Sequence, residues 1–430
     1  MTAKTVRARS RRTAGTVAVA GILGLSACAA PTSSNPDLSA DRPAAEASAA
    51  ADLAVSLNDA GYRVFHASLA DGENTAVSPL SIGLAFGMLD AGATGSVAEA
   101  LEGLFAYPVT GEARLDAFNS LDLLASSDPD NFPEPGDDEP AHAIVRVANR
   151  VFTDTGFVPL DSYTEDLATY FGAGAQTEPL STDGEKSADD INAWVSERTE
   201  GLIPTLLTPD AFDADSRLTL VNTLYMKAQW QTPFASDATY DEPFTLGDGS
   251  SVDVPMMHSG TTSGLVYQGE GFVAVALPYA YGELEMTLIV PDADAYGDVE
   301  DALDSALLDE VDAGAAAREF TLAMPTFTAT STTDLRAVIE GTLGVDGLFG
   351  TVGLDGIGPD LEVTAAVHAV KVIVDEDGTE AAAATAIMAG TTSMPADPPI
   401  EIRADHPFLY VIRDADTGAV LFVGRVLDPR

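Results

Sequence analysis

The chain has 430 residues and 46% of them are hydrophobic, so it can form one large domain or two ordinary ones with a sizeable core. Its 67 acidic residues outnumber its 21 lysines and arginines, which gives a formal charge of −46 at pH 7. This balance argues against nucleic acids and anionic membrane surfaces as partners, because both carry negative charge themselves.

Residues 1–27 are typical of an export signal. A basic start precedes an apolar run at 17–25 that is too short for a comfortable transmembrane helix. Cys28 is the only cysteine, so we expect no disulfide, and its place at the end of the signal indicates a lipid anchor rather than a catalytic thiol. We expect an exported protein that is lipid-anchored on the outer face of the cytoplasmic membrane or released extracellularly, with no other membrane contact.

Residues 28–50 are rich in alanine, serine, proline and aspartate, and are expected to form a flexible tether. Helical periodicity then runs over 51–69. A second helix is predicted from Ser78, a capping residue followed by proline, to a stop at Gly92. The acidic, proline-containing stretch 126–140 is expected to be an exposed loop.

Apolar runs predict strands at 144–152, 218–226, 272–277, 285–290 and 320–325. Residues 189–200 are predicted to form a helix. The last thirty residues alternate strands and turns, with apolar runs at 408–413 and 420–426. Helices cluster early and strands late, and no clean linker follows residue 51, which predicts one α+β domain over 51–430.

The stretch 375–385 reads Asp-Glu-Asp-Gly-Thr-Glu-Ala-Ala-Ala-Ala-Thr and follows a predicted strand at 369–374. A loose, proline-containing segment lies beyond it at 390–399. With a period of two, residues 379, 381, 383, 385 and 387 share a face that carries no charge and little bulk. Such a face can enter a sheet without burying an unpaired ion. Composition alone favours a simpler interpretation, an alanine-rich linker or helical turn.

This stretch resembles the reactive-loop hinge of the serpins, protease inhibitors whose loop inserts into their own central sheet. Other serpin-like segments follow in the family's order over about 51–430, which is far more specific than one motif. They are Ser78-Pro79-Leu80-Ser81-Ile82, Ile191-Asn192-Ala193-Trp194-Val195, Leu220 to Trp230, Leu277-Pro278-Tyr279, Met324-Pro325-Thr326-Phe327, His406 to Ile412 and Phe422 to Val426. The resemblance implies an α+β, serpin-like single domain with a large central sheet, further sheets, about eight or nine helices and an exposed C-terminal reactive loop at about 376–400.

The resemblance also assigns roles to residues. The implied hinge consists of Glu376, Gly378, Thr379, Glu380, Ala381, Ala382, Ala383, Ala384 and Thr385. The implied shutter, where the central sheet opens, consists of Ser78, Ser81, Asn222 and His368. Trp230 resembles the breach, where the loop first enters the sheet. The residues alone equally allow the shutter group to be a helix cap, a strand amide and a satisfied core histidine with no switching role.

The hinge favours an inhibitory serpin, because no arginine or proline interrupts it before Pro395. The family's usual spacing from the hinge glutamate makes Thr392–Ser393 the predicted reactive bond, with Met388 and Met394 as alternatives. A small neutral residue at the cleaved position suits elastase-like or subtilisin-like proteases, whereas methionine would suit chymotrypsin-like ones. The absence of Lys and Arg from 372–402 disfavours trypsin-like targets.

We therefore expect a monomeric serine protease inhibitor that acts as a suicide substrate. Its partner would be a serine protease, or alternatively a papain-like cysteine protease. We expect no catalytic residues, metal or cofactor, because the five histidines are scattered and no nucleophile, zinc or phosphate motif is present.

Two other classes of function are compatible with parts of the sequence. A non-inhibitory serpin would act as a cell-surface binding module, and its loop would be cut without trapping the protease. A hydrolase on an unrelated fold would need an activated nucleophile near a histidine, which the sequence does not show.

Overall fold

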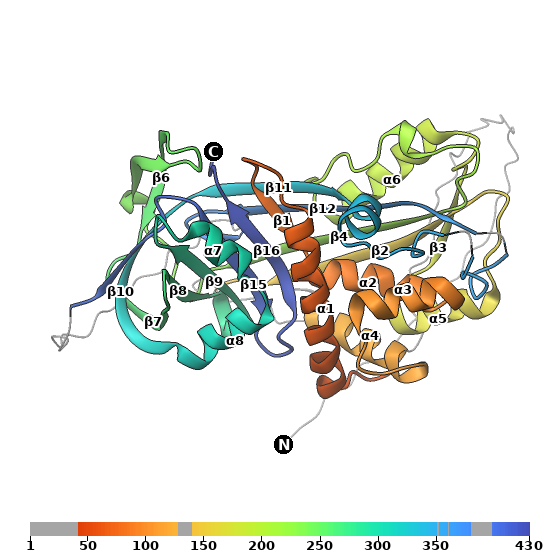
Figure 1. The fold of residues 1–430 in the computed structure, drawn as a ribbon, viewed down its shortest axis with the longest axis horizontal. Coiled ribbons are helices and arrows are strands. Elements are labelled where there is room, and N and C mark those ends of the chain that lie inside the picture. The colour runs from red at the N-terminus through yellow and green to blue at the C-terminus, as the bar shows by residue number, and fades with distance from the viewer. Residues whose placement is uncertain (1–41, 128–139, 351, 360, 380–397) are drawn as a thin grey trace, which may run out of the picture. The chain divides into compact units, whose positions relative to one another are not determined.

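The structure is a computed structural model, and it describes residues 42–127, 140–350, 352–359, 361–379 and 398–430 (Figure 1). The described residues contain eight α-helices: α1 (Ala47–Ala67), α2 (Pro79–Asp90), α3 (Gly95–Phe105), α4 (Glu112–Ala125), α5 (Asp161–Phe171), α6 (Gly184–Arg198), α7 (Tyr296–Asp301) and α8 (Ser305–Gly314). A π-helix occupies Ala337–Thr342. No helix of this described part has both the length and the apolar character needed to cross a membrane.

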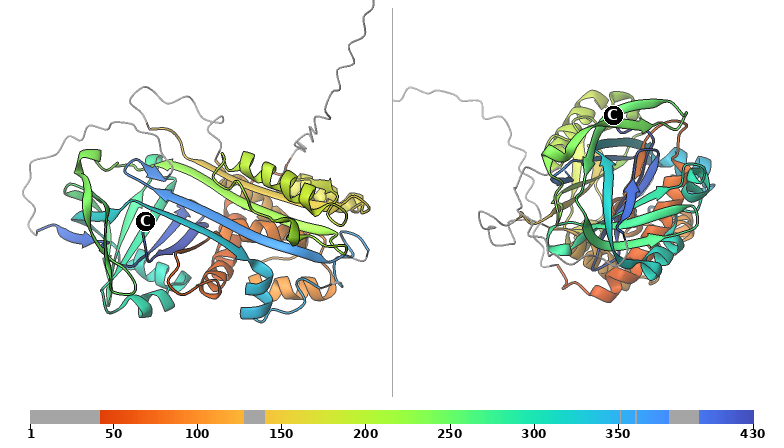
Figure 2. Two further views of the ribbon diagram at one scale, coloured as in Figure 1. Left: turned by 90° about the horizontal axis from the view of Figure 1, so that it is seen from above. Right: turned by 90° about the vertical axis from the view of Figure 1, so that its left-hand side faces the viewer.

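Six strands form a sheet that we call the hinge sheet. Their order is β11 (Phe327–Asp334), β12 (Val363–Val374), β13 (Gly378–Thr379), β4 (Leu218–Gln229), β2 (Ile144–Asp154) and β3 (Ala175–Glu178). β12 also pairs directly with β4, in parallel, below the point where β13 lies between them. The long strands of this sheet run side by side across the molecule in Figure 1 and in the left-hand view of Figure 2.

The second sheet has ten strands. Nine of them follow one path: β1 (Thr75–Val77), β16 (Val420–Val426), β15 (Phe408–Asp414), β9 (Leu284–Pro291), β8 (Phe272–Pro278), β7 (Thr262–Gln268), β10 (Ala316–Pro325), β6 (Ser251–His258) and β5 (Thr239–Thr245). The tenth, β14 (Ile400–Arg403), pairs in parallel with β10. β14 is the first element after the undescribed residues 380–397.

The two faces of the hinge sheet pack into different cores. Along β4, Leu218, Leu220 and Leu224 point into the main core, while Val221 points to the other face. α6 covers that other face, and its buried Ile191 packs with Val221 in a separate small core (Figure 2). The period-two pattern of the sequence thus decides which face of β4 meets α6.

Most predicted elements are present, with shifted ends. The helix expected at 51–69 begins at Ala47, because the alanines ahead of it are good helix formers. The helix expected at 189–200 begins at Gly184, where the Asp183 side chain accepts a bond from Lys186 N at 3.1 Å and caps it. The strands β5, β7 and β11 were not predicted, because their polar, partly exposed sequences lack a long apolar run.

Arg42 fixes the chain just ahead of α1. Its guanidinium donates to Asn119 Oδ1 at 2.9 Å, to Asp122 Oδ2 at 2.8 Å and to Tyr170 O at 2.9 Å. The flexible tether was expected to extend to residue 50, but folded structure begins before that residue. Folded structure is present from Arg42 on, because the fork of guanidinium donors satisfies acceptors on α4 and α5.

Replacing Arg42 with alanine should lower the free energy of unfolding by about 2–3 kcal/mol, because the largely buried carboxylate of Asp122 loses its partner. Thermal unfolding measures this effect. Arg146→Ala is the matched control, since Arg146 and Glu200 form an exposed pair whose loss should cost less than about 1 kcal/mol. Equal losses in both variants would contradict a structural role for Arg42.

Candidate functional site

The first two residues of the predicted loop strand lie inside the hinge sheet. Thr379 pairs with Val374 of β12 on one side and with Ala228 of β4 on the other, and both pairings are antiparallel. Gly378 pairs with Gln229. β13 is therefore a short wedge between two long strands, at the end of the sheet where those strands separate.

The chain reaches β13 through a tight turn. Asp375 Oδ1 accepts bonds from Asp377 N at 3.0 Å and Gly378 N at 3.1 Å, and Asp375 N donates to Gly378 O at 2.9 Å. Burial raises the pKa of Asp375, and the nearby charge of Asp377 adds to the rise. Gly378 has a φ of 155°, and a Cβ there would collide with the carbonyl oxygen of Ala228. Only glycine fits this position.

Trp230 holds the turn from the end of β4. Its indole Nε1 donates to Asp375 O at 3.0 Å, and its backbone N donates to Asp377 O at 2.8 Å. The indole stacks on Tyr279 with ring centroids 4.4 Å apart and planes 14° apart. The Tyr279 hydroxyl and Thr379 Oγ1 form a buried hydrogen bond of 2.7 Å. The stacked rings of Trp230 and Tyr279 cover one side of Thr379, which is 2% exposed.

The four residues of the predicted shutter lie together where the start of α2 meets β4 and β12 of the hinge sheet. Ser78 caps α2 by accepting a bond from Ser81 N at 3.2 Å, and its own N donates to His368 Nε2 at 3.0 Å. Asn222 Nδ2 donates to Ser81 O at 2.6 Å and also bonds Asn149 Oδ1. The Ser81 hydroxyl donates to Asn222 Oδ1. The group joins α2 to β4, β12 and β2 in one buried network.

The protonation state of His368 follows from its partners. Its Nε2 accepts the bond from Ser78 N and so carries no proton, which leaves the ring hydrogen on Nδ1, 3.3 Å from Asn222 Oδ1. Burial lowers the pKa of His368 to about 3. A charged imidazolium would bring a second N–H against the Ser78 donor and break this bond.

The native state should therefore become less stable as the pH decreases, because the buried ring of His368 must stay neutral. The unfolded histidine has a pKa near 6.5, so the contribution of the neutral ring is fully present above pH 6.5 and is lost progressively toward pH 3. Between pH 7 and pH 5 the wild type should lose about 2 kcal/mol more than His368→Gln, in which this titration is absent. Unfolding measured at both pH values tests this, and equal losses would show that the ring is not held neutral.

The shutter network spans two strands that are direct neighbours. His368 and Asn222 are register partners in the parallel pairing of β12 with β4. That pairing ends at Ala369 and Thr223, and β13 lies between the same two strands farther along. Extending β13 down the sheet requires the strands to separate at the pair that the network bridges.

Two further residues belong to this site. Tyr279 contacts both Trp230 and Thr379, and Asn149 is the register partner of Asn222 on β2. Sequence reasoning assigned neither a role, although Tyr279 lies in the serpin-like Leu277-Pro278-Tyr279. Within the described ranges, no group of three or more His, Cys, Asp or Glu side chains is placed to hold a metal ion.

Several predicted site residues lie outside the described residues. They are Cys28, Glu380, Ala381, Ala382, Ala383, Ala384, Thr385, Met388, Thr392, Ser393 and Met394. Of the predicted hinge, the structure describes Glu376, Gly378 and Thr379. Glu376 O accepts a bond of 2.8 Å from Phe234 N, which ties it to the segment that leaves β4.

Comparison with known proteins gives the same family throughout. A family model described as serpin (serine protease inhibitor) matches residues 55–429. Iripin-3 of Ixodes ricinus is 32% identical over 87% of this chain and 94% of its own length, and neuroserpin of Mus musculus is 29% identical over 83% and 86%. The native state of tengpin, a thermophilic serpin, shares the fold with a TM-score of 0.76 at 22% identity, covering 87% of this chain and 94% of that one. The chain therefore belongs to the serpin family, whose members are generally protease inhibitors rather than catalytic enzymes.

Proposed function

We propose that this protein inhibits a serine protease as a suicide substrate. The observation that carries the proposal is β13, which already lies between β12 and β4: Thr379 pairs with both strands and Gly378 with β4. Lengthening β13 after cleavage would add a central strand to the hinge sheet. The residues that would follow are small and uncharged on the face that turns to the core.

The register of β13 supports a specific end state. Continued along the same strands, it would place Thr385 between Asn222 and His368, on the face where the shutter network lies. A threonine hydroxyl can both donate and accept, so it could replace the bond that these two side chains share when the strands are adjacent. Glu380 would lie beside Lys227 on the face away from the main core, where its charge would be paired.

In the proposed reaction the protease is acylated as by an ordinary substrate, but the acyl-enzyme is not hydrolysed. The target's serine oxygen attacks the carbonyl of Thr392, the Thr392–Ser393 bond breaks, and the new amine of Ser393 takes the proton passed on by the protease's histidine. The product is an ester between the protease and Thr392. Insertion of the freed strand then distorts the protease before water can hydrolyse the ester, and strand pairing supplies the free energy.

The test is incubation with elastase, subtilisin, chymotrypsin and trypsin, followed by denaturing gels and mass spectrometry. We expect an SDS-stable complex with elastase or subtilisin and a released peptide that begins at Ser393. A peptide beginning at Ala389 or Pro395 would keep the mechanism and move the bond to Met388 or Met394. Cleavage by these enzymes without a complex would favour the alternative, a non-inhibitory serpin acting as a binding module.

We also propose that the mature chain begins at Cys28 and is lipid-anchored on the outer face of the cytoplasmic membrane, or released from it. A basic start, a short apolar run and a single cysteine at its end support this. Expression with Cys28→Ser should leave the protein unlipidated, which mass spectrometry of the N-terminal peptide detects. An unmodified Cys28 in the exported wild type would contradict anchoring.

A further inference from the structure

One turn of the ten-stranded sheet holds a tyrosine in a backbone conformation that bulky residues avoid. Tyr281 lies between β8 and β9 with a φ of 65° and a ψ of −9°. A positive φ crowds the side chain of an L-residue against its own backbone, so glycine usually fills such positions. The other described non-glycine residues with positive φ, Ala106 and Glu200, lie just beyond the C-terminal ends of α3 and α6. In the described part of the chain, Tyr281 alone shows this strain in a turn between strands.

The side chain of Tyr281 reaches out of its own sheet to the start of β2. Its ring stacks on His142, with centroids 4.1 Å apart and planes 12° apart, and its hydroxyl donates to Pro140 O at 2.7 Å. The tyrosine is 46% exposed, so burial does not hold it there. Between the two contacted residues, Ala141 N donates to Gln229 Oε1 at 2.9 Å, at the end of β4. These contacts join the β8–β9 turn to β2 and β4 of the hinge sheet.

This link crosses the boundary that loop insertion would move. A new strand between β12 and β4 requires these two strands to separate along the sheet. β2 pairs with β4 from Ile144 to Thr153, so β2 and β4 would move together. On the other side of the opening, β12 pairs with β11, and β11 follows β10 after Thr326 alone. The β11–β12 half is thus covalently fixed to the ten-stranded sheet, and the β4–β2 half must move relative to it.

We propose that Tyr281 is a positioning residue for the inhibitory reaction: it holds β2, and through β2 also β4, against the β8–β9 turn until the cleaved loop inserts. Glycine would suit the turn conformation better, but it has no side chain to reach His142 and Pro140. The strain is therefore kept together with the contact that it makes possible. This inference rests on the proposed function, because a hinge sheet that never opens has no need of such a contact.

The rate at which the hinge sheet opens can be measured without a protease. A synthetic peptide of residues 380–388, Glu-Ala-Ala-Ala-Ala-Thr-Ala-Ile-Met, has the sequence that would form the new strand. It is added to the uncleaved mature protein, and formation of the one-to-one complex is followed by native mass spectrometry. We expect Tyr281→Ala to take up the peptide at least about tenfold faster than the wild type, because a hydrogen bond and a ring stack no longer resist opening.

Three further variants separate the contact from general stability. Tyr240→Ala is the matched control: Tyr240 is 53% exposed and stacks on His258 with centroids 4.4 Å apart, but both residues lie within the ten-stranded sheet. Its loss should leave peptide uptake unchanged. Tyr281→Phe keeps the stack and loses the bond to Pro140, so its rate should be intermediate. Tyr281→Gly should take up the peptide as fast as Tyr281→Ala and unfold at a higher temperature than that variant, because glycine relieves the strain.

The outcomes distinguish this inference from the proposed function. Equal uptake by the wild type and Tyr281→Ala would overturn the role of Tyr281, as would an equal acceleration by Tyr240→Ala. Uptake rates that simply follow the unfolding temperatures of the variants would make Tyr281 a general stabiliser and would also overturn the proposal. Uptake by none of the proteins, wild type included, would contradict loop insertion itself and overturn both.

Discussion

Thr379→Arg should convert the protein from an inhibitor into a plain substrate of its target protease. Thr379 is 2% exposed and its hydroxyl is bonded to Tyr279, whose ring stacks on Trp230. The hydroxyl of Tyr279 cannot neutralise an arginine at this position, and burying an unpaired charge costs several kcal/mol. Because every 1.4 kcal/mol is a factor of ten, insertion should slow by at least about a hundredfold relative to deacylation.

The measurement is the fraction of protease captured in an SDS-stable complex at increasing ratios of inhibitor to protease. The wild type should capture nearly all of it, whereas Thr379→Arg should be cleaved in the loop and release active enzyme. Thr328→Arg is the matched control, since Thr328 is an exposed residue of the same sheet and its replacement should leave capture unchanged. Undiminished capture by Thr379→Arg would mean that inhibition does not depend on the seating of residue 379 between β12 and β4.

Under the proposed mechanism, the buried network at the shutter residues would hold the sheet closed until the loop is cleaved. β12 and β4 are direct neighbours at His368 and Asn222, and a network of neutral, fully buried groups bonds them to each other and to Ser78 and Ser81. Opening the sheet would break the hydrogen bonds of all these groups at once, so the barrier to strand separation is cooperative. An incoming strand that carries a hydroxyl at the right register can satisfy them again.

The fold could be predicted because segments that resemble the serpins follow in the family's order along the chain, and because the strand that carries Asn222 is a largely apolar run. The resemblance also implied that the four shutter residues form one group. The sequence assigned no role to Tyr279 or Asn149. A hydrogen bond such as Tyr279–Thr379 joins residues 100 positions apart, so it leaves no local pattern in the sequence. The sequence indicated that residue 379 lies on a face that can enter the sheet, but it did not indicate that Tyr279 would be the hydrogen-bond partner of this residue.

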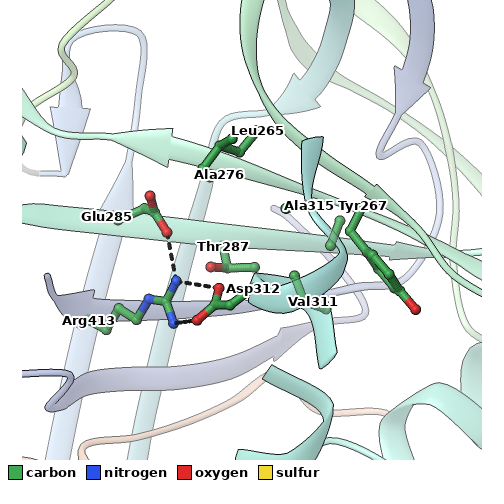
Figure 3. Close-up of a pocket in the computed structure, with 10 residues that line it drawn as sticks. Leu265, Tyr267, Ala276, Glu285, Thr287, Val311, Asp312, Ala315 and Arg413 are labelled. Carbon is green, nitrogen blue, oxygen red and sulfur yellow. Dashed lines mark hydrogen bonds and ion pairs between the residues drawn. The ribbon is translucent and has the colours of Figure 1, made fainter. Parts of the chain in front are cut away.

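The N-terminal boundary and a hollow beneath α8 show a different limit. The alanine-rich stretch before α1 has the composition of a linker, and only the bonds of Arg42 to α4 and α5 show that the fold reaches back to it. A hollow of about 230 Å³ lies between α8 and the ten-stranded sheet, where the small residues Ala274 and Ala276 of β8 line it together with Val311 of α8 (Figure 3). Cavities depend on the facing element, so no pattern along one strand predicts them.

Cleavage within the loop should raise the thermal unfolding temperature by at least about 10 °C. Insertion of 380–387 between β12 and β4 would give the new strand a hydrogen-bonded neighbour on each side, at about 1 kcal/mol net for each bond, and bury its small side chains. A gain on the order of 10 kcal/mol moves the midpoint of a domain of this size by about that many degrees.

Calorimetry of intact and cleaved protein measures the shift, with cleavage by a protease that is not trapped. Thr379→Arg cleaved at the same bond should show little or none of this rise, because its strand cannot seat beside Tyr279. Cleaved wild type that unfolds at the same temperature as the intact protein would mean that the native state is not metastable. Loop insertion needs the free energy stored in a metastable native state to distort the protease. Without that stored free energy, inhibition by loop insertion would be excluded even if denaturing gels showed a complex.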